Sequence, residues 1–308
     1  MEQHGSGKRQ DQADTLRRLM HGRVAIRPQT FKPIRVISVT SGKGGVGKTN
    51  IVANLAVLLQ RLGHKVLVLD GDFGLANLNI VMGLEPKGTL YDVLEGTKTI
   101  EEVMLTGPGG IRVIPASSGI FKMTQLSMAE KAILMERLEQ SPFSFDVLLI
   151  DTGAGINSDV TYLNSAATEV IVVATPEPTS IADAYALMKV MSQDYRVKRF
   201  KLLVNMVANP KEGLGVYNNI LNVADRFLNI SIEYLGHVLD DRKISQAVLS
   251  RKVACESYPT SLAVRCLETT AKSLIDTPAK GELTGNVQFF WRTLLKEDET
   301  SAVDRREL

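Results

Sequence analysis

The feature that most constrains this chain is a glycine-rich loop at residues 41–50, which reads S-G-K-G-G-V-G-K-T-N. The loop matches the phosphate-loop pattern G-x-x-x-x-G-K-[ST] and follows an apolar run at residues 34–40. Apolar residues then recur at helical spacing over residues 52–59, and Gly63 marks the end of that helix. Strand, loop and helix in this order predict a site for nucleotide phosphates, because glycine N–H groups and a helix N-terminus both attract anions.

The positions of this loop have different expected roles. Nine loop residues are expected to contact the nucleotide: Gly42, Lys43, Gly44, Gly45, Val46, Gly47, Lys48, Thr49 and Asn50. Lys48 is expected to reach the β- and γ-phosphates, and the Thr49 hydroxyl is expected to bind Mg²⁺. Lys43 is an additional lysine, placed where it cannot easily reach the phosphates of its own subunit. We therefore expect ATP to lie between two copies of the chain, with Lys43 acting across the interface as an arginine finger does.

Carboxylates follow two further strand-like runs. One apolar run ends in D-G-D-F-G, which places Asp70 and Asp72, and residues 147–150 run into D-T-G-A-G-I, which begins with Asp151. Ligands of open α/β sheets bind at the carboxyl ends of the strands, so these acids are expected beside the phosphate loop. Asp70 and Asp151 are predicted to lie on the Mg²⁺ side, and Asp72 is predicted to orient or activate the attacking water. The structural alternatives are turn chemistry for Asp70 and Asp72 and a helix N-cap for Asp151.

Strand-like and helical segments alternate from residue 34 to residue 276. The predicted strands are residues 35–40, 65–70, 111–116, 145–151, 169–174, 201–207 and 233–239. Continuous apolar runs suit strands that are buried on both faces, as in a parallel sheet. The pattern predicts an α/β domain at residues 34–276 with a doubly wound, mostly parallel sheet of the P-loop type, whose last helix spans residues 260–275. Residues 1–33 are rich in charge and glutamine and predict a flexible arm with one short helical patch.

Composition narrows the functional classes. The 308 residues are 44% hydrophobic and 23% charged, which is typical of a soluble globular protein. A net charge of +2 does not predict binding to specific nucleic acids. Cys255 and Cys266 have no metal-type spacing and suit a reducing compartment. No apolar stretch approaches the ~20 residues of a membrane span, and the N-terminus lacks the apolar core of a signal peptide, so the expected location is the cytoplasm.

The segment at residues 277–308 is predicted to contain a linker, an amphipathic helix and a tail. Five apolar residues form one stripe at helical spacing: Val287, Phe290, Trp291, Leu294 and Leu295. Arg292 and Lys296 lie beside this stripe, which is the makeup of a helix that lies in a membrane interface. The alternative is a helix packed on the body of the same chain. Two such helices on an ATP-bound dimer would bind an anionic membrane more tightly than one, so we expect peripheral association with the inner face of the cell membrane.

Three motifs together resemble the MinD/ParA family of deviant-Walker ATPases. They are the loop K-G-G-V-G-K-T, the segment D-G-D-F-G-L-A-N-L-N and the loop D-T-G-A-G, and the resemblance covers about residues 34–275. Within that family the chain is most similar to the FlhG (FleN) group, the MinD-like regulators of flagellar number and placement. The motifs behind this are D-Q-A-D-T-L-R at residues 11–17, E-P-T-S-I-A-D-A-Y-A-L at 177–187 and L-G-H-V-L-D-D at 235–241. The resemblance implies a homodimeric ATPase that uses ATP, ADP and Mg²⁺, with slow hydrolysis that dimerisation and the membrane accelerate.

The resemblance also implies partners and a base-binding residue. In the family, the arm motif engages FlhF, a signal-recognition-type GTPase, and stimulates GTP hydrolysis, which implies Gln12, Leu16 and Arg17 as contacts. Asn205 fits the family's adenine-contacting asparagine, with a structural turn role as the alternative. The backbone around Asp240 is a second candidate, although this segment reads V-L-D-D where MinD relatives have a proline-containing turn. Flagellar switch (C-ring) proteins and a flagellar transcription regulator are further implied partners.

Four other functions fit parts of this pattern. A MinD-type division-site selector shares the ATPase motifs, but MinD proteins begin almost directly at their first strand and lack the arm. A ParA-type DNA segregation ATPase requires a strongly basic surface, which a net charge of +2 does not favour. An iron–sulfur carrier of the same fold requires a C-x-x-C pair, and the two cysteines here are too far apart. A scaffold that only binds nucleotide is disfavoured because Lys43, Lys48, Asp72 and Asp151 are all present.

Overall fold

The computed structural model describes most of the chain between Ile34 and Asp276. The described residues are 34–72, 77–116 and 143–276, together with Glu130, Ile133, Leu134, Arg137 and Ser141. The predicted arm and the predicted C-terminal helix lie outside them, and so do the candidate contacts Gln12, Leu16, Arg17, Val287, Phe290, Trp291, Leu294 and Leu295. Over the described residues, none of the helices has the length and apolarity needed to cross a membrane.

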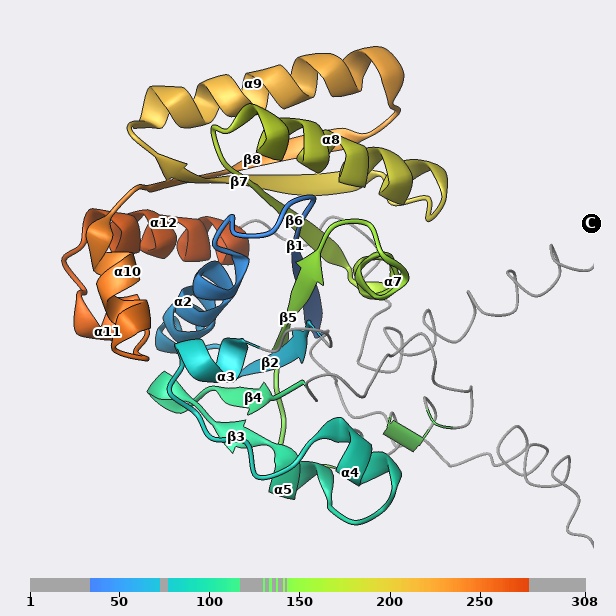
Figure 1. Cartoon of the computed structure of the whole chain (residues 1–308), viewed down its shortest axis with the longest axis vertical. Coiled ribbons are helices and arrows are strands. Elements are labelled where there is room, and N and C mark those ends of the chain that lie inside the picture. Colours follow the sequence, from blue (N-terminus) through green and yellow to red (C-terminus); the bar gives the residue numbers. More distant parts are fainter. Residues whose placement is uncertain are drawn as a thin grey trace, which may run out of the picture. The chain divides into compact units, whose positions relative to one another are not determined.

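A mostly parallel sheet forms the centre of the described body (Figure 1). Its eight strands within the described residues are β1 (Arg35–Ser41), β2 (Val66–Gly71), β3 (Leu105–Thr106), β4 (Arg112–Ile114), β5 (Val147–Ala154), β6 (Glu169–Ala174), β7 (Arg199–Val207) and β8 (Ser231–Leu239). Their order is β3-β4-β2-β5-β1-β6-β7-β8, and only the β3–β4 pair is antiparallel. The predicted α/β class and doubly wound, mostly parallel sheet are confirmed, because each predicted strand has a counterpart here.

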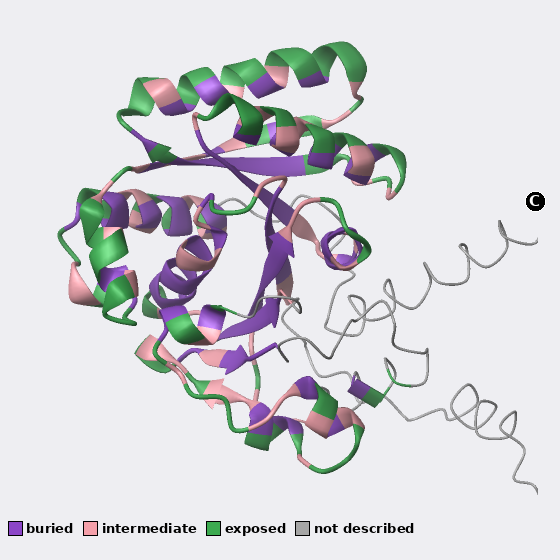
Figure 2. Ribbon diagram, in the orientation of Figure 1, coloured by how far each residue is buried: buried purple, intermediate pink, exposed green. Residues whose placement is uncertain are grey.

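Helices cover both faces of this sheet. They are α2 (Lys48–Arg61), α3 (Leu78–Val81), α4 (Leu90–Leu94), α5 (Ile100–Val103), the 3₁₀ turn η1 (Pro108–Gly110), α7 (Ser158–Ala166), α8 (Pro178–Gln193), α9 (Pro210–Phe227), α10 (Arg242–Leu249), α11 (Ala254–Ser257) and α12 (Leu262–Asp276). Alternate strand residues point to opposite faces. Ile37 therefore packs with α2, α3 and α10 to α12, whereas Val36 packs with α4, α5 and α7. Figure 2 shows the resulting buried centre, in which the middle strands and most of α2 are inaccessible.

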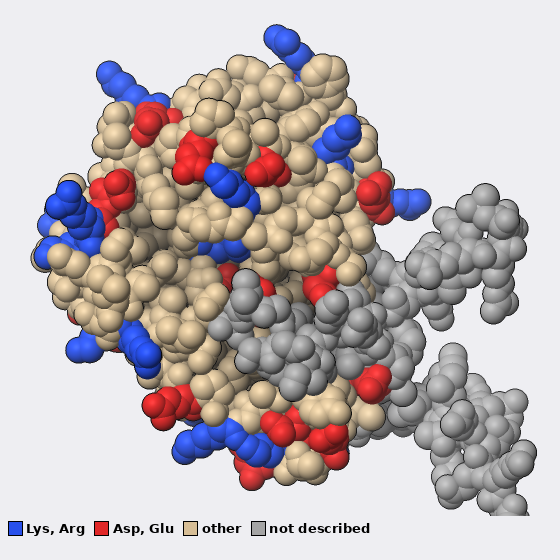
Figure 3. Space-filling model, in the orientation of Figure 1, with Lys and Arg blue, Asp and Glu red and all other residues tan. Residues whose placement is uncertain are grey.

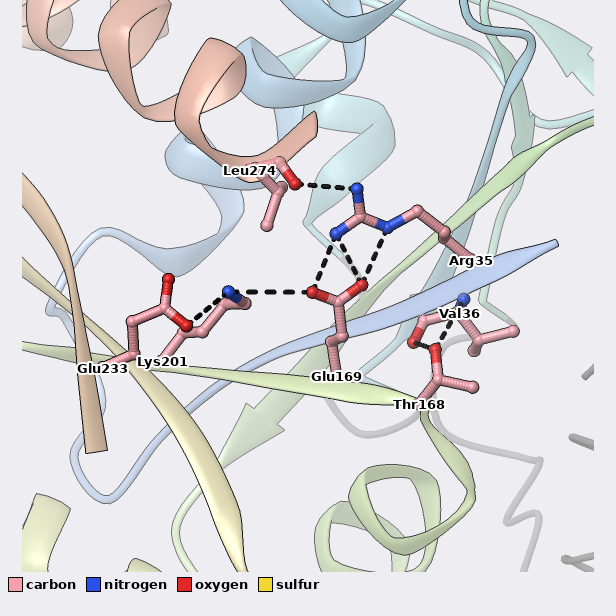
Figure 4. Close-up of polar contacts among 7 residues, drawn as sticks. All are labelled: Arg35, Val36, Thr168, Glu169, Lys201, Glu233 and Leu274. Atoms are coloured by element: carbon pink, nitrogen blue, oxygen red, sulfur yellow. Dashed lines mark hydrogen bonds and ion pairs between the residues drawn. The ribbon is translucent and has the colours of Figure 1, made fainter. Parts of the chain in front are cut away.

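A network of charged side chains joins the amino-terminal ends of four strands (Figure 4). Arg35 of β1 makes two hydrogen bonds of 2.8 Å to Glu169 of β6 and donates a third, of 2.7 Å, to the carbonyl of Leu274 near the end of α12. Lys201 of β7 lies 3.9 Å from Glu169 and bonds to Glu233 of β8 at 2.9 Å. Since ligands of parallel sheets bind at the carboxyl ends of the strands, this network lies at the opposite edge from the predicted site and serves to hold the sheet and α12 together.

Candidate nucleotide-binding site

The phosphate loop connects β1 to α2 in a conformation that requires glycine. Gly45 and Gly47 have φ angles of 80° and 88°, in the left-handed region that side chains disfavour. At Gly42 the reason is space, because a Cβ atom would lie only 2.1 Å from the carbonyl oxygen of Asp183 in α8. The loop is therefore shaped by its own backbone and by close packing against α8, before any ligand binds.

Asp151, at the carboxyl end of β5, is the acid most suited to bind a metal. Its side chain is 2% exposed, it accepts a hydrogen bond from the Thr49 hydroxyl, and its Oδ1 atom has no hydrogen-bond partner among the described residues. Burial raises its pKa to about 7, although Thr49 and Lys48 act in the opposite direction. A buried oxygen without a partner fits Mg²⁺ or a water bound to it, since Mg²⁺ prefers oxygen ligands and keeps several waters.

Lys48 begins α2 and is the buried cation of the site. Desolvation lowers its pKa, while the carboxylates of Asp151 and Asp72 favour its charged form. Asp72 lies beside the D-T-G-A-G loop, because its Oδ1 atom would be 3.5 Å from a Cβ atom placed on Gly153. The three strand ends thus bring Lys48, Asp72 and Asp151 to one edge of the sheet, in the neighbourhood expected of them.

Asp70 differs from Asp151 in that both of its carboxylate oxygens accept backbone hydrogen bonds. It is 1% exposed, and its two carboxylate oxygens accept the backbone N–H groups of Asp72 at 3.1 Å and Leu78 at 3.4 Å. Burial, followed by the charge of Asp151 opposite it on β5, raises its pKa to about 8. These bonds fix the turn after β2, and the metal-binding role of Asp70 stays a prediction. Within the described residues no three His, Cys, Asp or Glu side chains form a metal cluster, so a magnesium site would combine Asp151 with the Thr49 hydroxyl and phosphate oxygens.

Lys43 is bonded within its own subunit, outside the loop. Its ammonium group donates to Glu177, at 2.5 Å from Oε2, and to the Thr179 hydroxyl at 3.0 Å. Both partners lie at the start of α8, and the Lys43 and Glu177 side chains are 38% and 64% exposed. Sequence reasoning missed the roles of Glu177 and Thr179, although both belong to the E-P-T-S motif that supported the family resemblance. Lys43 is therefore available to leave an exposed ion pair.

The candidate base-binding residues lie where β7 and β8 end. The Asn205 side chain is 8% exposed, and its Nδ2 donates to the Val46 carbonyl of the phosphate loop at 2.8 Å. Asp240 is exposed, and its N–H donates to the Val207 carbonyl at 2.9 Å. The next residue, Asp241, caps α10 and accepts a hydrogen bond from Ser261, which lowers its pKa. Adenine contacts by Asn205 and Asp240 stay predictions, but the structure brings Asn205 directly to the loop.

Comparison with known proteins gives evidence on the protein family that is independent of the site geometry. The family model described as an AAA domain matches residues 34–202. The antiactivator FleN of Pseudomonas aeruginosa is 40% identical over 273 residues, which cover 89% of this chain and 98% of FleN. The flagellum site-determining protein YlxH of Helicobacter pylori is 34% identical over 85% of this chain and 90% of YlxH. A chain of the MinC:MinD cell division complex of Aquifex aeolicus superposes with a TM-score of 0.64 at 28% identity, covering 79% of this chain and 96% of that chain.

The chain belongs to the MinD/ParA family of ATPases. This confirms the resemblance that the three motifs indicated. The family hydrolyses ATP, and the loop at Lys48, the Thr49–Asp151 pair and Asp72 remain the predicted ATP site of this chain.

Proposed function

We propose that this MinD/ParA protein is an ATP-driven dimerisation switch that regulates the number or placement of flagella. Two relatives carry names that point to this process, the antiactivator FleN and the flagellum site-determining protein YlxH, and FleN is matched over 98% of its length. The observation that carries the switch is the exposed pairing of Lys43 with Glu177 and Thr179. A lysine held outside its own loop is free to act on a nucleotide bound by a second copy.

The free energies of the contacts involved favour the transfer of Lys43 from Glu177 to a nucleotide bound by a second copy. An exposed ion pair such as Lys43–Glu177 contributes about 0–1 kcal/mol. A charge-assisted hydrogen bond to a phosphate oxygen contributes about 1.5–3 kcal/mol, and exclusion of water by a second subunit strengthens it. Transfer of Lys43 from Glu177 to the phosphates of the partner subunit is therefore favourable once two ATP-bound copies meet, and it is unfavourable when the γ-phosphate is absent.

Within each subunit, the remaining residues supply positioning and charge. Backbone N–H groups of the loop and the N-terminus of α2 would surround the phosphates, with Lys48 beside them. Mg²⁺, when bound through Thr49 and Asp151, supplies neutralisation of the phosphate charge. Asp72 would accept a hydrogen bond from the attacking water and hold it in line with the leaving group. With Lys43 arriving from the second subunit, hydrolysis would be slow in the monomer and faster in the dimer.

The output of the switch is proposed to be membrane residence and partner binding. The C-terminal stripe from Val287 to Leu295 would bind the inner face of an anionic membrane, more tightly as a pair than singly. The arm residues Gln12, Leu16 and Arg17 would engage an FlhF-type GTPase. A flagellar transcription regulator is a further proposed partner, consistent with the word antiactivator in the name of FleN.

The charge pattern on one face of the molecule gives little support to a DNA segregation role. On the face seen in Figure 3, lysine and arginine side chains are interspersed with aspartate and glutamate, with no continuous basic area. Binding to the DNA backbone requires basic residues gathered on one face. The charges on this face therefore favour the flagellar assignment over a ParA-type cargo.

The test is ATP hydrolysis measured against protein concentration, with and without anionic liposomes. Wild type should show specific activity that rises with concentration, whereas Lys43→Ala should stay flat and low. Lys65→Ala is a matched control, because the exposed Lys65 ammonium group donates to the Ser144 hydroxyl, away from the phosphate loop. Activity that is independent of concentration in wild type, or that is unchanged in Lys43→Ala, would refute the dimer switch. Stimulation of GTP hydrolysis by an FlhF-type GTPase, lost in Gln12→Ala, tests the flagellar assignment separately.

A further inference from the structure

Strand β7 contains a bulge at the point where it reaches the phosphate loop. Val204 pairs with His237 of β8 and Val207 pairs with Leu239, so Asn205 and Met206 together face one residue of β8. Met206 has a φ angle of 58°, in the left-handed region that is costly for a residue with a side chain. Bulges of this kind change the direction of side chains and occur often beside functional sites.

The bulge brings two successive side chains to the same glycine. In a regular strand, neighbouring side chains point to opposite faces. Here a Cβ atom placed on Gly47 would meet the Asn205 Nδ2 atom at 2.4 Å and the Met206 Cε atom at 3.5 Å. Both side chains therefore lie at the end of the phosphate loop, where α2 begins. Asn205 is buried there against the loop, while Met206 remains 45% exposed beside it.

Neither property of Met206 stabilises the folded chain. A left-handed backbone is strained for methionine, and an exposed thioether gains little from burial. Two other described residues that are not glycine share such a φ angle, Arg196 at 57° and Arg251 at 52°, but both are polar. A strained, exposed, apolar side chain beside a phosphate site fits a surface that a ligand covers, and the flat ring of a nucleobase is the apolar part of a nucleotide.

We propose that Met206 is a nucleotide-binding residue whose thioether forms an apolar wall against the purine ring. The inference rests on the proposed function, since it deepens the description of the same site. The Asn205 amide is oriented by the Val46 carbonyl, which must receive the donor Nδ2. The Asn205 Oδ1 atom is then left as a hydrogen-bond acceptor on the side away from the loop. A purine whose amino group donates to Oδ1 would place the face of its ring near the Met206 thioether. Sulfur–aromatic contacts of this kind are favourable and tolerate irregular geometry.

The experiment compares binding of ADP and of inorganic pyrophosphate, by calorimetry, to wild type and Met206→Gly. Removal of the thioether is expected to weaken ADP binding about three- to tenfold and to leave pyrophosphate binding unchanged. Relief of the left-handed strain should at the same time raise the thermal midpoint of the nucleotide-free protein by about 1–3 °C. Met206→Asn should show the same loss of ADP affinity without added backbone freedom, because asparagine tolerates this conformation.

Arg196→Gly is the matched control. It relieves the same kind of strain in the segment between α8 and β7, so the thermal midpoint should rise while ADP affinity stays as in wild type. Unchanged ADP affinity in both Met206 variants would overturn the inference, and so would a parallel loss of ADP and pyrophosphate binding, which would indicate damage to the loop. Failure of wild type to bind either ligand would instead refute the proposed function, and the inference with it.

Discussion

Removal of the Glu169 carboxylate should destabilise the protein without affecting its nucleotide site. Glu169 is 8% exposed and lies between Arg35, at 14%, and Lys201, at 11%. In Glu169→Gln, Lys201 keeps its bond to Glu233, but Arg35 loses the opposing charge and one of its two carboxylate acceptors, and keeps the carbonyl of Leu274. Breaking a buried pair by removing one partner costs about 3–5 kcal/mol, because the other charge is left without compensation.

The expected loss of folding stability in Glu169→Gln depends on how far these charged groups are buried. Each retains some contact with water, so we expect the lower limit, about 3 kcal/mol. For a domain of this size that corresponds to a fall of about 6–12 °C in the thermal midpoint. Glu233→Gln is the matched control, since Glu233 is 47% exposed and its pair with Lys201 should contribute about 0–1 kcal/mol.

The assay combines urea unfolding with ADP binding at 25 °C. Glu169→Gln should shift the unfolding midpoint clearly below that of Glu233→Gln, while both variants bind ADP like wild type. Equal unfolding midpoints in the two variants would show that burial does not govern this network. Weaker ADP binding in Glu169→Gln would show that the two edges of the sheet are coupled, and would refute the independence of this network from the nucleotide site.

Two further outcomes are expected at the nucleotide edge. Gly42→Ala should weaken ADP binding about tenfold or more, because the new Cβ atom would lie 2.1 Å from the Asp183 carbonyl oxygen and displace the loop. Gly215→Ala is the control, since a Cβ atom at Gly215 meets no atom within 4 Å, and this variant should bind ADP like wild type. Calorimetry with ADP measures both affinities. Asp151→Asn should raise the thermal midpoint of the nucleotide-free protein at pH 8 and change it less at pH 5. Burial raises the pKa of Asp151 from 3.8 to about 7, so its protonation stabilises the fold at low pH and that contribution is lost as pH rises through 7. A midpoint difference that is independent of pH would show that ionised Asp151 is not the cause.

Local sequence patterns were sufficient to predict the sheet and the position of the site. Apolar runs locate the strands because both faces of a parallel sheet are buried, as for Leu148 and Leu149, which pack on opposite faces. The glycine pattern locates the loop, and the rule for strand ends brings Asp72 and Asp151 to it. The short antiparallel strand β3 carries no comparable pattern, since Leu105 and Thr106 are its only residues.

Contacts between segments that are distant in the sequence could not be predicted from such local patterns. The Lys43–Glu177 pair joins residues 134 positions apart, and nothing local to Lys43 indicates it. The bulge at Asn205 and Met206 depends on how β7 pairs with β8, and the apolar run through β7 reads as a regular strand. The backbone bonds to Asp70 likewise depend on where the turn after β2 folds back. Each of these features is set by tertiary packing rather than by propensity.

The contacts around the phosphate loop also bear on how the switch works. The loop is held in advance at three points, by Asn205 on the Val46 carbonyl, by the Gly155 N–H on the Ser41 carbonyl at 2.9 Å, and by Gly42 against α8. A loop fixed in this way has little freedom to lose when phosphates bind. Lys43 differs, because its side chain is exposed and held only by an ion pair and one hydroxyl. In the proposed switch, activation by a second subunit would require the movement of one lysine side chain per subunit, with no rearrangement of the loop backbone.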